Sequence, residues 1–288
     1  MEAVIRSCGK RLGAFAAALA LALPAAALPP GAPWTLRHPA DPVPFHGMGP
    51  SGQADGTSMS MLYPAPNLAG LVAAVVTHAA MNEAMRQHRT EQAQNEADRV
   101  LEPLRELLLA LTHAQLMHLA LQAIPEHGAT AVGTESPAAP GWQVSSTPVF
   151  FLTQDRLALV LDNTVDIFPP GETAKPAYTA TVRVVSRART EEDPVAAWKD
   201  QLQADSARLI AHSLVLALRD ARRPAGAPAS YRSLRYLQGG SEKVERAQLV
   251  EAWCEREVMR TLRGWLLSAP VKAQAGAPAC DPAELVKS

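Results

Sequence analysis

The placement of proline most constrains what this chain can fold into, because proline lacks a backbone donor and interrupts helices and sheet interiors. Eight of the 24 prolines lie before residue 58, and three lie after residue 269. Between these limits, proline-free runs alternate with short breaks. We therefore predict one folded domain over 58–269, a Pro/Gly-rich, loosely ordered leader over 28–57, and a flexible tail over 270–288.

The first 27 residues predict an export signal. Three basic residues precede a 12-residue apolar run, and a Pro followed by three Ala residues closes it, as in a secretory signal peptide. The run is shorter than the roughly 20 residues of a membrane-spanning helix. The residues concerned are Arg6, Lys10, Arg11, the run Leu12 to Leu23, Pro24 and Ala25 to Ala27.

This pattern predicts a signal peptide over 1–27 that is cleaved near Ala27. The mature chain would then be periplasmic or secreted and would have no transmembrane span. An uncleaved anchor is the alternative. Cys8 lies before the apolar run rather than directly after it, which argues against a lipid-anchored precursor.

Net charge excludes one broad class of function. The chain carries 27 Lys+Arg and 28 Asp+Glu, and removal of three basic residues and Glu2 with the signal leaves 24 and 27, a formal charge of -3. A broad nucleic-acid-binding surface needs a clustered excess of basic residues. We therefore expect no nucleic-acid partner.

Hydrophobic periodicity predicts an α+β domain. We expect an antiparallel or mixed sheet of about five strands, with about four helices packed largely on one face. A doubly wound α/β sheet is the alternative. The expected strands are 59–63, 143–152, 156–168, 178–189 and 231–237, and the expected helices are 68–101, 104–124, 194–223 and 241–267.

Three arginines form the strongest candidate binding site. Residues 178–189 alternate between apolar and polar side chains, so a strand there places Arg183, Arg187 and Arg189 on one face. Such a face suits the carboxylates of an envelope protein or an anionic envelope component. The alternative is a solvated face whose charge is balanced by nearby glutamates.

No motif predicts a cofactor, a metal or a catalytic residue. The sequence lacks HExxH and G-x-S-x-G, and His113 and His118 are five residues apart, which separates them on a helix. Gly239-Gly240-Ser241 is interpreted as a turn that begins the helix 241–267, with Ser241 as its cap. An anion held at that helix start is the alternative.

Two cysteines remain after the signal, Cys254 and Cys280. An oxidising compartment permits them to form a disulfide, but the sequence leaves open whether they pair.

Residues 67–107 resemble exported proteobacterial envelope proteins. The string NLAGLVAAVVTHAAMNEAMRQHRTEQAQNEADRVLEPLREL joins a small-residue apolar helix to a charged segment and a "PLR" helix. It is similar to the curli-secretion CsgG-like and penicillin-binding-protein-activator LpoB-like α+β modules, although it lacks their lipobox cysteine. The resemblance implies a periplasmic binding or assembly module and transfers no catalytic residue.

The sequence thus favours an exported, non-enzymatic binding or assembly protein of the cell envelope. Two alternatives stay open. One is a cofactor-free periplasmic hydrolase whose catalytic residues come from several elements. The other is a peripheral membrane protein that uses the apolar helix 68–81, although a core helix explains the same stretch.

Overall fold

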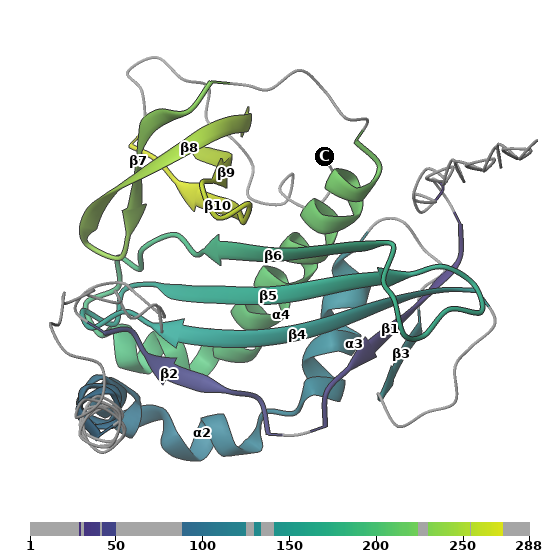
Figure 1. The fold of residues 1–288 in the computed structure, drawn as a ribbon. Coiled ribbons are helices and arrows are strands. Elements are labelled where there is room, and N and C mark those ends of the chain that lie inside the picture. Colours follow the sequence, from purple (N-terminus) through teal and green to yellow (C-terminus); the bar gives the residue numbers. More distant parts are fainter. Residues whose placement is uncertain are drawn as a thin grey trace, which may run out of the picture.

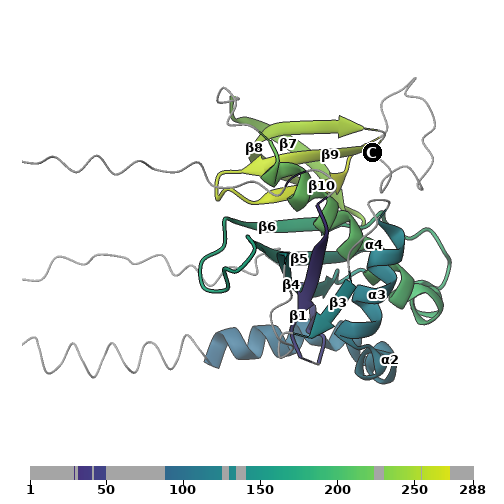
Figure 2. The ribbon, with the colours of Figure 1, turned by 90° about the vertical axis from the view of Figure 1, so that its right-hand side faces the viewer.

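A mixed β-sheet with helices against one face forms the body of the protein (Figure 1, Figure 2). This arrangement confirms the α+β class. A computed structural model describes residues 29, 32–40, 42–49, 88–124, 130–133, 141–223, 230–253 and 255–272. The predicted signal over 1–27, the expected strand 59–63 and most of the expected helix 68–101 lie outside the described residues.

Nine strands of the described chain follow the order β3-β1-β4-β5-β6-β10-β9-β8-β7, and β2 pairs with β4 beside β1. The strands are β1 (Trp34–His38), β2 (Phe45–Gly47), β3 (Thr130–Gly133), β4 (Trp142–Leu152), β5 (Leu159–Phe168), β6 (Tyr178–Val185), β7 (Arg232–Gln238), β8 (Ser241–Trp253), β9 (Arg256–Thr261) and β10 (Leu266–Pro270).

The antiparallel ribbon β4-β5-β6 forms the centre of the sheet, as its alternating sequence predicts. Val182 and Val184 of β6 are fully buried, whereas Thr179 is exposed. Inside the ribbon, Asn163 accepts a hydrogen bond from the Ser146 hydroxyl and donates one to Ser213 on the neighbouring helix. These bonds satisfy buried polar groups that would otherwise destabilise the core.

Local signals account for the helices on one face. Asp193 caps α4 (Pro194–Ala221) by accepting hydrogen bonds from the amides of Val195 and Ala196, and proline occupies the first helical position. The expected helix 104–124 is interrupted at Leu111, because Thr112 starts a new helix through a capping box with Gln115. The elements here are a helix over 88–98, η1 (Arg99–Leu104), α2 (Arg105–Ala110) and α3 (His113–Ala123).

The last four strands cover one end of the opposite face of the sheet, at Val160 and Val185. In Figure 1, β7 to β10 curl away above β6, and they enclose a second apolar core. This core joins Val160 and Val185 of the central ribbon to Tyr236, Met259 and Leu267. The main core lies on the other side, between the ribbon and the helices α3 and α4.

The expected helix 241–267 is wrong, because this segment forms β8, β9 and β10. Its residues have good helix propensity, but the partner strands β7 and β6 provide pairing and burial that outweigh that preference. Gly239-Gly240 is therefore a two-residue hairpin turn rather than a helix start, and the anion site expected there has no helix to form it.

The expected leader contributes two strands to the sheet. Trp34 and Leu36 are buried where β1 pairs with β4, and Phe45 stacks on Phe150 with ring centroids 4.7 Å apart. Strands β1 and β2, together with β3 and the three strands of 241–270, explain why the sheet exceeds the expected five strands.

Asp155 fixes the β7–β8 turn against the β4–β5 turn. Its carboxylate accepts hydrogen bonds from the Thr153 hydroxyl and from the amides of Leu157 and Gly240. Partial burial raises the pKa of this carboxyl, but the three bonds outweigh that effect and hold the pKa below its usual value. Gly239 has a φ of +60°, and an added Cβ would lie 2.5 Å from a carboxylate oxygen of Asp155.

Gly239→Ala should therefore destabilise the protein more than Gly264→Ala. Gly264 also has a positive φ, +81°, but an added Cβ there meets nothing within 4 Å. Both variants incur left-handed strain of about 1 kcal/mol, and only Gly239→Ala also displaces Asp155. Urea denaturation measures both free energies of unfolding, and equal losses would contradict a close contact at Gly239.

Candidate functional site

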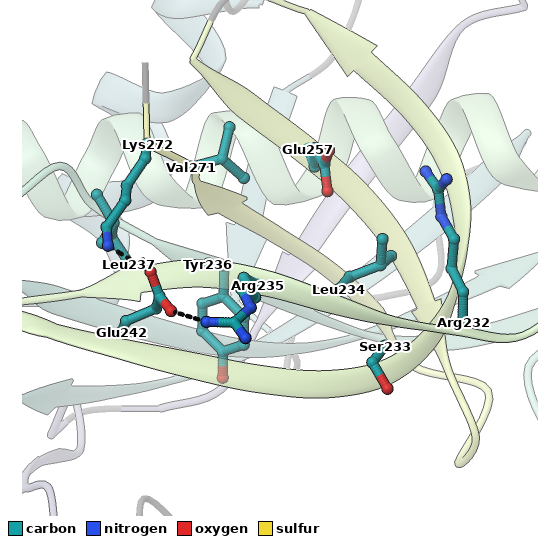
Figure 3. A pocket seen from close by; sticks show the side chains of 10 residues that line it. All are labelled: Arg232, Ser233, Leu234, Arg235, Tyr236, Leu237, Glu242, Glu257, Val271 and Lys272. Carbon is teal, nitrogen blue, oxygen red and sulfur yellow. Dashed lines mark hydrogen bonds and ion pairs between the residues drawn. The ribbon is translucent and has the colours of Figure 1, made fainter. Parts of the chain in front are cut away.

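A groove of about 390 Å³ runs along β7, the last strand of the sheet. We call it the β7 groove. One wall is β7 itself, and the other is formed where β9 and the end of β10 pass, as Figure 3 shows. The side chains that line it are Arg232 to Leu237 on β7, Glu242 on β8, Glu257 on β9, and Val271 and Lys272 after β10.

Strand β7 presents one open backbone edge to this groove. It pairs with β8 on one side, and no other described strand pairs with it. The two-residue turn makes Gln238 and Ser241 the closing hydrogen-bonded pair of the hairpin. Because antiparallel pairs alternate, the backbone N–H and C=O groups of Ser233, Arg235 and Leu237 point away from β8, toward the open edge.

The side chains of β7 alternate in the same way. Leu234 and Tyr236 are buried in the second core, which fixes the strand in place. Burial also raises the pKa of the Tyr236 phenol above its usual value. Arg235 lies on the opposite face and is exposed, so the open edge is flanked by a rigid apolar face and a charged face.

The lining of the groove carries three cationic side chains and two carboxylates. Arg235 and Lys272 both contact Glu242, at 2.7 Å and 2.6 Å, and lower the pKa of its carboxyl (Figure 3). One carboxylate therefore balances two cations. Arg232 lies at the other end of β7, is exposed, and has no ion-pair partner among the described residues. Glu257 is the remaining acid of the lining.

The structure places the three arginines expected from the sequence on different surfaces. Arg183 pairs with Asp162 on β5 through two hydrogen bonds of 2.6 Å, and the side chains are only 14 % and 13 % exposed. Strand β6 ends at Val185, so Arg187 and Arg189 do not continue its alternation. The expectation of one shared arginine face is therefore wrong.

Arg189 is part of the packing against α4. Its guanidinium lies 3.8 Å from the centre of the Trp198 ring, contacts Asp205 at 2.5 Å, and is 6 % exposed. Trp198 in turn donates a hydrogen bond from Nε1 to the carbonyl of Arg156. Arg187 is different, since it is 46 % exposed and meets Glu255 at 3.3 Å. Of the three, Arg187 presents the most accessible charge.

A buried arginine joins β6, β9 and β10. Arg256 is 5 % exposed and donates hydrogen bonds to the carbonyl of Val185 and the hydroxyl of Ser268. Burial, with a smaller contribution from Arg187, lowers the pKa of this guanidinium to about 10. Ser268 Oγ is also 2.9 Å from His212 Nε2.

The Ser268–His212 pair has the spacing of a nucleophile and its base, but it does not support the hydrolase hypothesis. Ser268 is fully buried and His212 is 6 % exposed, so a substrate does not reach them. The β7 groove contains neither residue. His212 instead packs in the core near Trp253.

Several other expected features fall outside the described residues. These are Cys254, Cys280 and the apolar helix 68–81. Among the described residues, no helix is long and apolar enough to span a membrane. The same part of the chain holds no group of three or more metal-ligating His, Cys, Asp or Glu side chains.

The sequence does not predict the β7 groove, because the segment after the Gly-Gly turn has the pattern of a helix. One signal was available, since a Gly-Gly pair between two β-rich runs is typical of a tight hairpin. The expected strand 231–237 was confirmed as β7. Nothing local in the sequence indicates that β7 ends the sheet, because strand order depends on long-range pairing.

Comparisons with known proteins return no match: no family model, no curated protein and no solved structure matches this chain.

Arg189→Ala should destabilise the protein by about 2 kcal/mol, because it removes a buried cation–ring contact and leaves Asp205 with a less favourable environment. Arg187→Ala is the matched control and should cost less than about 0.5 kcal/mol, as its ion pair is exposed. Chemical denaturation of both variants tests this difference. Equal effects would show that Arg189 does not tie the segment after β6 to α4.

Proposed function

We propose that this chain is an exported, non-enzymatic binding module of the cell envelope, which holds an extended segment of a partner protein along β7. The observation that carries the proposal is the open edge of β7 beside a groove. An exposed strand edge offers unpaired N–H and C=O groups to an added strand.

The remaining geometry supports strand addition. Strand β7 has seven residues, so its edge extends about 23 Å at 3.3 Å per residue. Leu234 and Tyr236 anchor it in the second core, so an added strand meets a preformed edge. Val271 and Leu237 give the groove apolar contacts, and the cations at its two ends give it polar ones.

Export is proposed from the sequence of residues 1–27, and the cell envelope from the resemblance of residues 67–107 to exported envelope modules. A partner contact through Arg187 also remains a prediction. Arg183 and Arg189 are engaged within the fold, so changes at these two positions are expected to act through stability as well as through any partner contact.

Ser233→Pro tests the proposed function, with Ser233→Ala as its matched control. Proline removes the N–H of Ser233, which points to the open edge, and leaves the β7–β8 hydrogen bonds in place. Peptides are first selected on the full-length chain from a random phage-displayed library. Their affinities for both variants are then measured by fluorescence anisotropy.

The selected peptides should bind Ser233→Pro about tenfold more weakly than the wild type, since a backbone hydrogen bond is lost and the edge is blocked. Ser233→Ala should stay within about twofold. Thermal unfolding of both variants checks that the fold is retained. The proposal fails if the library yields no binder, or if the binders do not distinguish Ser233→Pro from the wild type.

A further inference from the structure

We infer that the partner segment held along β7 is acidic, with carboxylates that meet Arg232 at one end of the groove and Arg235 with Lys272 at the other. This inference rests on the proposed function, because it names the chemistry of the strand that the β7 edge accepts. It is independent of the arginines expected from the sequence, none of which lines the groove.

The charge balance of the groove carries the inference. Its lining has three cations and two carboxylates, and the β7 sequence RSLRYLQ has two arginines and no acid. Glu242 already shows how the groove accepts a carboxylate, since Arg235 and Lys272 approach it together. These contacts leave one cationic charge in excess at this end.

The two charged places also fit the geometry of an added strand. Arg232 and Arg235 are three residues apart, so their side chains leave opposite faces of β7. Cross-strand neighbours on the same face lie about 5 Å apart, and opposite charges there attract. An incoming strand therefore meets a cation on each face and needs acidic side chains at an odd spacing.

The same charges argue against a second copy of this chain as the occupant. Two β7 edges paired with each other would bring four arginines and no β7 acid together along one ladder. Charged side chains on edge strands commonly prevent such self-pairing. An edge protected in this way still accepts a strand of opposite charge, which gives selectivity by electrostatics.

Three eight-residue peptides labelled with fluorescein probe the inference. The first is Val-Glu repeated four times, in which one Glu exchanges places with a neighbouring Val. Both faces of the peptide strand then carry an acidic side chain. The second replaces every Glu of the first by Lys. The third is the acidic peptide with every backbone amide N-methylated, which removes the N–H donors of both of its edges. Each is titrated with the full-length wild-type chain.

The acidic peptide should bind at least about tenfold more tightly than the basic peptide, and the affinity should fall as salt is raised. Methylation should abolish binding. Arg232→Glu should weaken the acidic peptide about tenfold and strengthen the basic one, because one end of the groove changes sign. Arg105→Glu is the matched control, because Arg105 is 69 % exposed on α2 and does not line the groove, and it should change neither affinity by more than about twofold. Arg187→Glu is measured beside it, as the exposed arginine predicted from the sequence to contact a partner.

The outcomes separate this inference from the proposed function. Binding that Ser233→Pro abolishes, but that is equal for acidic and basic peptides, overturns only the acidic partner. Loss of binding in Arg187→Glu but not in Arg232→Glu overturns both and favours the arginine surface expected from the sequence.

Two other occupants would also overturn the acidic partner. Self-association that Ser233→Pro abolishes, measured by sedimentation, assigns the edge to a second copy of this chain. Displacement of the acidic probe by a peptide of residues 273–288 assigns the groove to the chain's own end.

Discussion

The parallel pairing of β10 with β6 is the constraint on which the rest of the structure depends. It joins Leu266, Leu267 and Ser268 to Val182, Arg183 and Val184. In the described chain, no other ladder connects the last four strands, β7, β8, β9 and β10, with the central ribbon. Because β10 continues the sheet beyond β6, the last four strands curl over the face that α4 does not cover. The second core exists only because of this curl.

Arg256 stabilises this joint from inside. Its guanidinium donates to the carbonyl of Val185, the last residue of β6, and to the hydroxyl of Ser268 on β10. A carbonyl at the end of a strand needs a donor when it is buried. A buried cation supplies this donor at a cost in desolvation free energy, and the same burial lowers the pKa of Arg256. Here one side chain holds β6, β9 and β10 together, and the groove beyond them depends on that arrangement.

The elements that sequence could predict are those with a local cause. The cap at Asp193, the alternation of 178–185 and the hairpin of β4 and β5 all follow from neighbours in the chain, and the structure confirms them. Residues 241–253 have a weaker local signal. Their charged and apolar residues suit a helix as well as a strand, and only pairing with β7 and β9 decides between the two.

The candidate site was harder to predict because its defining property is that only one described strand, β8, pairs with β7. The alternation of residues 178–189 indicates Arg183, Arg187 and Arg189 as one cationic face. In the fold, Arg183 forms an ion pair with Asp162 on the neighbouring strand, and Arg189 forms one with Asp205 on α4. A charge pattern shows which side chains are cationic but not which cations the fold neutralises.

Strand order likewise decides which backbone N–H and C=O groups are paired within the sheet. Every strand has N–H and C=O groups on both edges, and the sequence of β7 differs little from that of an interior strand with charged residues. Among the described strands only β8 pairs with β7, because the chain continues from β8 to β9 and β10 along the other edge of β8, and β10 packs near β7 without forming a ladder with it. Arg232 and Arg235 at this edge restrict which strands can pair there, because they disfavour a copy of β7 and favour an acidic segment. The same two residues thus limit self-association and give the groove its selectivity.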